Sequence, residues 1–124
     1  MTKVIRFEDL EVWKEGRNLR RQVYSFTQKK EFSKYFSLVD QLRRASISIT
    51  SIIAEGFDAQ SNTEFVRFLR YSRRSASEVK DQLYAALDEG YITEREFLQA
   101  YELASTVSKM LYGFIRYLKN STKK

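Results

Sequence analysis

The sequence contains no cysteine, no histidine and no proline, and only four of its 124 residues are glycine. Without cysteine and histidine the chain has no disulfide, no thiolate nucleophile, no imidazole base and few means of binding zinc. Catalysis would have to rest on carboxylates, lysines or tyrosines alone. We therefore predict that the protein is not an enzyme, and we expect no catalytic residues, no metal and no cofactor.

The scarcity of proline and glycine also indicates the fold class. Small sheet-rich domains usually place these two residues in their turns, so their near absence favours a few long helices joined by short links. Apolar residues make up 43% of the sequence and aromatic residues 15%. This is enough to form one hydrophobic core, and we expect a single domain over residues 1–124.

Long hydrophobic runs are absent as well. The longest uncharged stretch, Ala45 to Ala54, is far too short to span a membrane, and the N-terminus has no apolar segment typical of a signal peptide. We expect no membrane association and a cytoplasmic location. The net charge of +6 favours an anionic partner, although many basic proteins bind no nucleic acid.

Four segments carry apolar or small residues at alternating spacings of three and four, which average 3.5 residues and are typical of helix bundles. Because the links are short, consecutive helices should be antiparallel. The sequence therefore predicts an all-α, antiparallel up-down four-helix bundle with helices at roughly 8–28, 37–57, 62–89 and 93–119. The predicted core positions are Val12, Gly16, Leu19, Val23, Phe26; Leu38, Leu42, Ala45, Ile49, Ile52, Gly56; Phe65, Leu69, Ser72, Ala76, Val79, Leu83, Ala86; and Phe97, Ala100, Ala104, Val107, Leu111, Phe114, Leu118.

The predicted helix ends carry recognisable capping signals. A hydroxyl residue followed three positions later by an acid is the spacing of an N-terminal capping box. Gly90 follows the third segment, where a left-handed C-terminal cap is expected. The pairs with capping spacing are Ser61 with Glu64, Thr93 with Glu96 and, as a weaker version, Ser37 with Asp40.

The second helix is unusual because residues 45–54 carry no charge on any face. A helix of a monomeric bundle usually keeps one charged face in water. Small hydroxyl side chains can bond to carbonyls of the preceding turn and allow another helix to come close. We predict that this stretch is an interface between subunits of a homo-oligomer, and the alternative is a small polar surface patch. The interface residues are Ser46, Ser48, Thr50 and Ser51.

Three blocks of sequence, FEDLEVW, DQLRRASISITSIIAEG and EFVRFLRYSRRSASEVKDQL, resemble the 23S ribosomal RNA intervening-sequence protein family. The resemblance extends from Phe7 to about Tyr117. It implies a small bacterial four-helix bundle that forms a homopentamer, and it implies no established biochemical activity. The chain departs from the usual pattern at Thr50, Ile52 and Arg74, where proline, asparagine and glycine are common.

The resemblance also singles out a set of polar motif positions. Arg43 paired with Glu55 or Glu78 would form a polar cluster at a ligand site or subunit interface. The alternative is that these side chains make structural ion pairs, while Gly56 lets two helices touch. The motif positions are Arg43, Arg44, Glu55, Gly56, Ser75, Glu78 and Gln82.

Arginines recur on one face of the third predicted helix and again on the first. Guanidinium groups in a row suit phosphate oxygens, and nearby tyrosines can stack on unpaired bases. The alternative is a solvated basic face, partly neutralised by Glu64 and Glu78. The candidate nucleic-acid-binding residues are Arg67, Arg70 and Arg74 on the third helix and Arg17, Arg20 and Arg21 on the first.

Charge is also uneven along the chain. Residues 81–102 hold six acids and one arginine, whereas residues 103–124 hold five basic residues and no acid. In an up-down bundle the acidic third turn lies at the same end as the basic first turn, which contains Lys29, Lys30 and Lys34. These opposite charges would pair either between subunits of a ring or within one chain.

These patterns give a leading function and two alternatives. The leading hypothesis is a non-catalytic, homo-oligomeric bundle that binds RNA or a ribonucleoprotein through basic helix faces, with recognition by shape and charge. The first alternative is a protein–protein interaction scaffold with no nucleic-acid role. The second is an enzyme that uses neighbouring carboxylates such as Glu78 and Asp81.

Overall fold

The computed structural model describes residues 4–122, and within that range it contains four α-helices and no strand. Two short 3-10 helices, η1 (Phe7–Asp9) and η2 (Phe32–Lys34), precede the first and second α-helices. The predicted all-α four-helix fold is confirmed. The four α-helices are α1 (Glu11–Thr27), α2 (Phe36–Phe57), α3 (Asn62–Asp88) and α4 (Glu94–Thr122).

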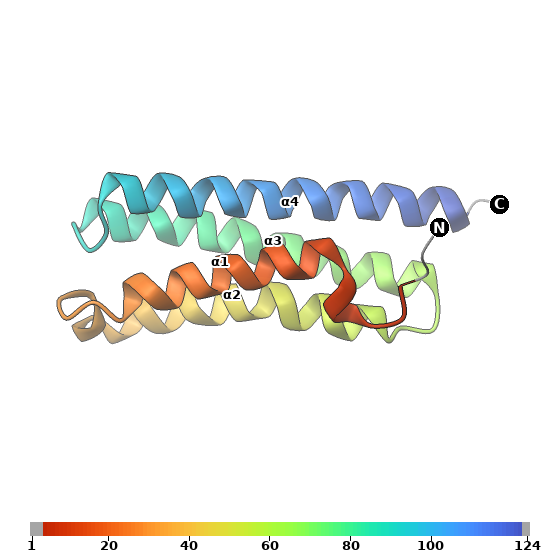
Figure 1. The fold of residues 1–124 in the computed structure, drawn as a ribbon, viewed down its shortest axis with the longest axis horizontal. Helices are drawn as coiled ribbons and strands as arrows, with labels where there is room; N and C mark the ends of the chain where they lie inside the picture. The colour runs from red at the N-terminus through yellow and green to blue at the C-terminus, as the bar shows by residue number, and fades with distance from the viewer. Residues whose placement is uncertain (1–3, 123–124) are drawn as a thin grey trace.

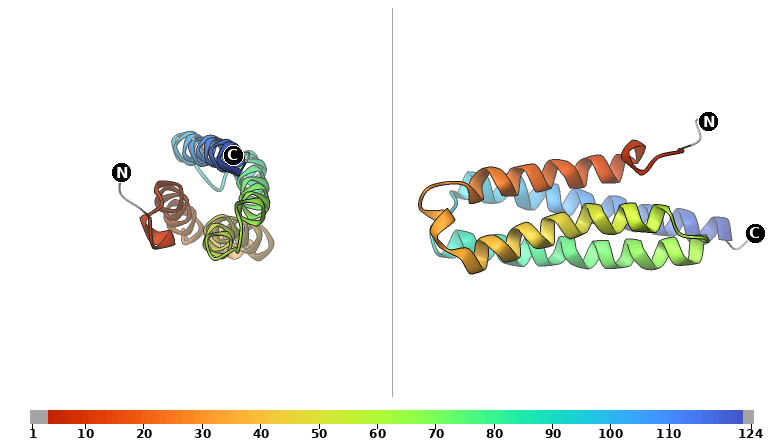
Figure 2. Two further views of the ribbon diagram at one scale, coloured as in Figure 1. Left: turned by 90° about the vertical axis from the view of Figure 1, so that its right-hand side faces the viewer. Right: turned by 90° about the horizontal axis from the view of Figure 1, so that it is seen from below.

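Successive helices run in opposite directions along a common long axis (Figure 1). In the end-on view they surround a shared centre, with α3 and α4 on one side and α1 and α2 on the other (Figure 2). Each helix packs against its neighbours in the chain, and α1 also packs against α4, which closes the bundle. The diagonal pairs do not come within contact distance in the described residues.

Side-chain caps precede two of the four α-helices in the described residues, α3 and α4. Thr93 and Glu96 form a reciprocal capping box, in which each backbone N–H donates to the other side chain, at 2.8 and 3.1 Å. The Ser61 side chain accepts from the backbone N–H of Glu64. The proposed cap at Ser37 is wrong, because α2 begins one residue earlier and the Ser37 hydroxyl accepts from Gln41 instead.

Two other boundaries differ from the predicted ranges. The first α-helix begins at Glu11 because residues 7–9 form the 3-10 turn η1, whose Phe7 ring packs edge-on against Trp13. Helix α4 continues to Thr122. At the end of α3, Gly90 has the expected positive φ of 76°, and the Tyr91 N–H closes the cap by donating to the carbonyl of Ala86.

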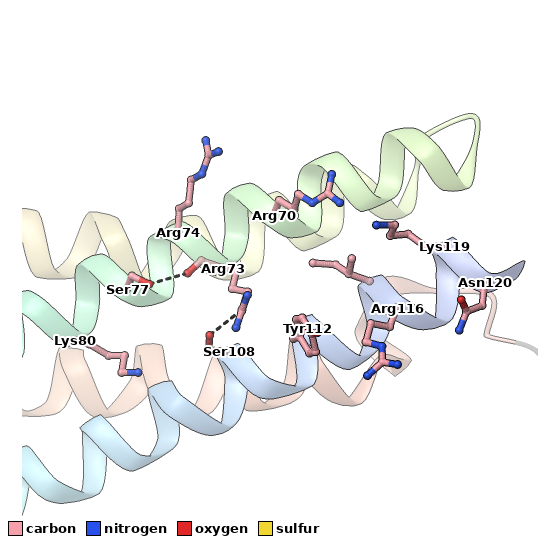
Figure 3. Close-up of a pocket in the computed structure, with 11 residues that line it drawn as sticks. Arg70, Arg73, Arg74, Ser77, Lys80, Ser108, Tyr112, Arg116, Lys119 and Asn120 are labelled. Carbon is pink, nitrogen blue, oxygen red and sulfur yellow. Dashed lines mark hydrogen bonds between the residues drawn. The ribbon is translucent and has the colours of Figure 1, made fainter. Parts of the chain in front are cut away.

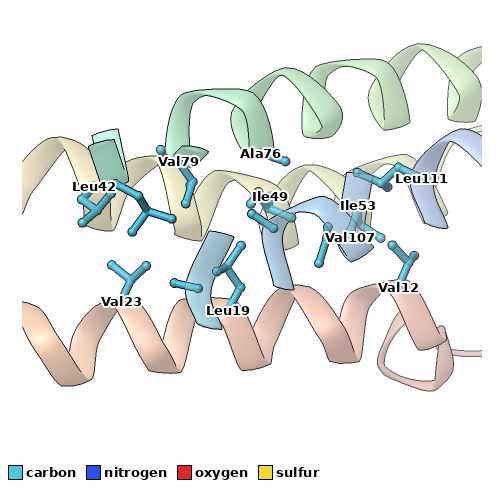
Figure 4. Close-up of a cluster of buried hydrophobic side chains, with 14 of the residues drawn as sticks. Val12, Leu19, Val23, Leu42, Ile49, Ile53, Ala76, Val79, Val107 and Leu111 are labelled. Atoms are coloured by element: carbon cyan, nitrogen blue, oxygen red, sulfur yellow. The ribbon is translucent and has the colours of Figure 1, made fainter. Parts of the chain in front are cut away.

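The core is a continuous column of aliphatic side chains contributed by all four helices (Figure 4). Leu42, Leu69, Leu83 and Leu111 are completely buried, as the spacing predicts. The small residues predicted in the seam are buried too. Ser72, for example, satisfies its hydroxyl inside the core by donating to the carbonyl of Ile49 on α2, at 2.8 Å.

Four predicted core positions are only half-buried, and the residue after each one is buried instead. Towards the C-terminal ends of α2 and α4 the spacing of three or four fixes the seam only to within one position, and the next seam residues, Gly56 and Leu118, are buried as predicted. On α3 the Phe65 ring leaves the seam to pack edge-on against Phe57 and Phe114. The corrected pairs, half-buried then buried, are Leu38 and Val39, Ile52 and Ile53, Phe65 and Val66, and Phe114 and Ile115.

Candidate nucleic-acid interface

A basic groove of about 780 Å³ lies between α3 and α4, and we call it the α3/α4 groove (Figure 3). It lies where the exposed sides of two neighbouring helices meet above the core. Six of its lining side chains are positively charged and none is acidic. The lining residues are Arg70, Arg73, Arg74, Ser77, Lys80, Ser108, Tyr112, Ile115, Arg116, Lys119 and Asn120.

Helical spacing explains why these residues gather in one place. On α3, Arg70, Arg73, Ser77 and Lys80 lie three, four and three positions apart, so they share the side of the helix that faces α4. The groove residues of α4 follow the same rule. One hydrogen bond links the two walls, because the Arg73 Nε donates to the Ser108 hydroxyl at 3.1 Å. Ile115 is buried and forms part of the apolar floor.

The charges in this groove are not neutralised by acids. Within residues 4–122, none of the six basic side chains of the groove forms an ion pair. Five of them are exposed, and Lys80 is half-buried with its Nζ above the Tyr101 ring. Uncompensated positive charge in a concave surface raises the local concentration of anions.

An exposed tyrosine lies among these cations. The guanidinium carbon of Arg73 is 5.0 Å from the centre of the Tyr112 ring, and that of Arg116 is 5.9 Å away. Figure 3 shows Arg73 directed towards α4, whereas Arg74 points away from α4 on the outer side of α3. The groove therefore offers guanidinium and ammonium donors for phosphate oxygens next to an aromatic face.

The structure brings together two of the three arginines predicted on the third helix. Arg70 and Arg74 line the groove, whereas Arg67 lies outside it, 4.0 Å from the Glu64 carboxylate and close to the Tyr71 ring. Arg116 and Lys119 also line the groove, although they were not among the predicted residues. The signal that could have identified them is the acid-free, basic run of residues 103–124.

The arginines predicted on the first helix form a separate surface, which we call the α1/α2 face. Arg17 and Arg21 are exposed, and Arg20 donates to the Thr50 hydroxyl on α2 at 2.9 Å. Arg43 of α2 joins them, with its guanidinium carbon 4.4 Å from the centre of the Tyr24 ring. The α1/α2 face is defined by Arg17, Arg20, Arg21 and Arg43.

The hydroxyl residues of the uncharged stretch lie in different environments. Ser46 and Thr50 are buried inside this chain, where their hydroxyls donate to the carbonyls of Arg43 and Ile47 at 2.9 and 3.0 Å. Their lack of charge is explained without a neighbouring subunit. Ser48 is half-buried and Ser51 is exposed, so these two remain accessible to a partner.

The motif positions do not form one cluster. Arg43 points towards α1, where its Nε donates to the Thr27 hydroxyl at 2.9 Å. In the described structure it forms an ion pair with neither Glu55 nor Glu78. Within one chain Arg43 therefore pairs with neither acid, because its side chain faces α1.

The remaining motif positions occupy three places. Arg44, Glu78 and Gln82 line a shallow groove between α2 and α3, and Arg44 lies 3.7 Å from the Asp40 carboxylate. Glu55 is exposed, and Ser75 is buried. Gly56 packs against α3, as the alternative interpretation expected: an added Cβ would lie 2.7 Å from the Cβ of Phe68.

Two side chains with shifted pKa values lie at the end of the bundle formed by the first and third turns. Burial and the neighbouring Tyr35 raise the pKa of Tyr91 to about 12. Burial opposes ionisation of Glu96, but the Lys29 ammonium, 2.6 Å away, and hydrogen bonds from Thr93 lower its pKa below the usual 4.5. The Lys29–Glu96 pair shows that the basic first turn and the acidic third turn meet within one chain.

The comparison with protein families identifies the group to which this sequence belongs. The sequence profile of the family described as 23S rRNA-intervening sequence protein matches residues 8–113. The chain belongs to this family. The match covers most of both helices that form the α3/α4 groove, but Arg116 and Lys119 lie beyond its end. No curated protein matches the chain.

A solved structure supports the fold assignment. It is the crystal structure of a protein with unknown function from the S23 ribosomal protein family of Bacteroides thetaiotaomicron. The TM-score is 0.77 at 23% sequence identity, and the alignment covers 84% of this chain and 97% of the other. At this identity the likeness establishes the bundle fold and not the activity.

The described part of the chain has neither a membrane-spanning helix nor a metal-binding cluster. No helix between residues 4 and 122 combines the length and the apolar character that a membrane crossing requires. The same residues contain no group of three or more acidic, cysteine or histidine side chains placed to hold a metal ion. The α3/α4 groove is the main candidate site because six basic side chains and no acidic side chain line it.

Proposed function

We propose that this member of the 23S rRNA-intervening sequence protein family binds RNA through the α3/α4 groove and catalyses no reaction. The observation that carries the proposal is a groove with six basic side chains, no acidic side chain and no ion pair within the described residues. Arginine and lysine donors bind phosphate oxygens regardless of base identity. Recognition therefore depends on backbone charge and shape.

The proposal includes assembly of several copies in the cytoplasm, with the homopentamer that the family resemblance implies. The support is the uncharged outer surface of α2, where Ser51 is exposed and Ser48 is half-buried. A ring would multiply the number of grooves available to one RNA. Light scattering over a range of concentrations should give a mass well above 14.7 kDa, and a monomer at micromolar concentration would remove this part of the proposal.

The decisive experiment compares three proteins in a titration with fluorescently labelled single-stranded RNA at low salt. One is the wild type, and the second is the groove variant Arg70→Ala/Arg116→Ala/Lys119→Ala. Because this variant loses three phosphate-binding cations, its affinity should be weaker by on the order of tenfold or more. Circular dichroism and light scattering should show an unchanged helix content and mass, since all three side chains are exposed.

The third protein is a matched control, Lys30→Ala/Lys34→Ala/Arg95→Ala. It removes the same amount of charge at the end of the bundle formed by the first and third turns, which we call the loop end. Its affinity should stay within about threefold of the wild type, because exposed charges beyond a Debye length are screened. If the control and the groove variant lose affinity equally, binding depends on net charge alone. That result would exclude the groove as the site.

A second candidate function is a protein-interaction scaffold without a nucleic-acid role. The observation that favours it is a group of aromatic side chains at the loop end, where Phe36 is 82% exposed beside Tyr35 and Tyr91. Purification from the protein's own cells separates the two functions. A nuclease-sensitive absorbance component supports RNA binding, and a stoichiometric second polypeptide without nucleic acid supports the scaffold.

A further inference from the structure

The α1/α2 face resembles the α3/α4 groove in charge, although it lies on different helices. Its arginines form no ion pair with any residue in the range 4–122. A shallow depression lined by Arg20, Arg21, Tyr24 and Ile47 separates the two helices there, and no acidic residue lines it. The molecule therefore has two basic surfaces, each with a tyrosine among its cations.

Hydrogen bonds across the bundle show that the two surfaces lie at the same height along its long axis. Arg20 bonds to Thr50 on α2, and the carbonyl of the adjacent Ile49 accepts from Ser72 on α3. The next residue of α3, Arg73, donates to Ser108 on α4. This chain of contacts runs from one basic surface through the core to the other. Figure 2 shows the α1/α2 pair and the α3/α4 pair on opposite sides of the bundle, so we place the two surfaces back to back.

The separation of the surfaces suits two negatively charged strands. Two layers of helices, each about 10 Å thick, place the surfaces roughly 20 Å apart. At physiological ionic strength the Debye length is about 8 Å, so phosphates bound on opposite sides repel each other only weakly. A backbone bound to one surface leaves the other available.

We infer that one chain binds two RNA segments at once, one in the α3/α4 groove and one on the α1/α2 face, and so bridges them. This inference rests on the proposed RNA binding and extends it from holding one strand to joining two. Each segment is held by its phosphates, with Arg17 and Arg21 supplying the most accessible donors on the α1/α2 face. Arg20 and Arg43 are held in place by Thr50 and Thr27.

A capture assay tests the bridge directly. One single-stranded RNA is fixed to beads, a second, non-complementary RNA carries a fluorophore, and the retained fluorescence is measured as protein is added. The wild type should retain the second RNA, with a maximum at intermediate protein concentration and a loss at excess, when each RNA binds its own protein. Three double variants are compared, namely Arg17→Ala/Arg21→Ala, Arg70→Ala/Lys119→Ala and the matched control Lys30→Ala/Lys34→Ala.

Each variant that removes cations from one surface should still bind a single RNA, but it should capture clearly less of the second RNA than the wild type does. Removing two phosphate contacts should also make the log–log salt slope of binding shallower by about 1.4. The control should capture as the wild type does. Light scattering on every variant checks that the oligomeric mass is unchanged.

Three outcomes would overturn parts of the account, and they are distinguishable. If no RNA binds the wild type at low salt, both the proposed function and the bridge are wrong. If RNA binds but the wild type captures no second RNA, the groove remains a site and the bridge is wrong. If the Arg17→Ala/Arg21→Ala variant captures as well as the wild type, the second strand is held by another groove of an oligomer, and the α1/α2 face has no role.

Discussion

Single residues determine how closely the helices approach each other. Gly56 lies where α2 meets α3, and an added Cβ would lie 2.7 Å from the Cβ of Phe68 and 2.9 Å from the Phe65 ring. A Cβ atom cannot move aside as the end of a flexible side chain can. Gly113 on α4 is the opposite case, because nothing lies within 4 Å of its added Cβ.

These two glycines give a matched pair of alanine substitutions. Gly56→Ala should destabilise the fold by about 1–3 kcal/mol through overpacking. Gly113→Ala should stabilise it by about 0.5–1 kcal/mol, because alanine loses less backbone entropy in a helix. Thermal or urea unfolding measures both. Equal effects of the two substitutions would contradict the close contact between α2 and α3.

The ion pair between Lys29 and Glu96 predicts a specific pH dependence. The folded-state pKa of Glu96 is lowered, so its stabilising contribution is present above the usual value of 4.5 and is lost as the pH falls through the folded-state value. Wild type should therefore exceed Glu96→Gln in stability near neutral pH, by less than about 1 kcal/mol because both side chains are partly exposed. The difference should shrink in acid.

Urea unfolding from pH 7 to pH 3 measures this dependence. Glu102→Gln is the control, because Glu102 is an exposed glutamate on the same helix with no ion pair in the described structure. A constant difference between wild type and Glu96→Gln at every pH would show that the carboxylate charge contributes nothing.

At the scale of the helices, sequence spacing predicted the number of elements, their approximate bounds and most of the core. It placed Ile52 in the core where the structure buries Ile53. Spacing defines a seam only to within one position, and the packing of the neighbouring helix decides which residue is inside. The predicted cap at Ser37 was wrong because α2 begins at Phe36, without a side-chain cap.

Alanine substitutions distinguish the predicted seam from the observed one. Ile53→Ala should lower the free energy of unfolding by about 2–5 kcal/mol, since the Ile53 side chain is fully buried. Ile52→Ala should lower it clearly less, because Ile52 is only half-buried. A similar loss of unfolding free energy is expected when each of the four buried leucines of the seam is replaced by alanine. These leucines are Leu42, Leu69, Leu83 and Leu111. Chemical denaturation measures each cost. If Ile52→Ala were the more damaging, the assigned rotation of α2 would be wrong.

The groove was only partly predictable because it belongs to a pair of helices. The three-and-four spacing of arginines on the third helix was visible in the sequence, and it correctly indicated Arg70 and Arg74. Which residues of α4 face them depends on the axial register of the two helices, which no local pattern specifies. The ion pair between Arg67 and Glu64 was foreseeable, since the two residues are three positions apart on one helix.

At the scale of the whole molecule, the distribution of charge matters more than its total. The loop end of the bundle pairs positive with negative charge, as Lys29 does with Glu96. Away from that end, basic side chains without an ion pair in residues 4–122 lie on two opposite surfaces. This division is what makes the net charge of +6 relevant to a polyanionic partner.

The central claim is that phosphate contacts in the α3/α4 groove hold the RNA. The most direct test is the wild-type affinity for single-stranded RNA as a function of salt concentration. Each contact contributes a slope of about −0.7 in a plot of log affinity against log salt, so three to six contacts predict a slope between about −2 and −4. A slope near zero, or no measurable affinity at low salt, would contradict the claim.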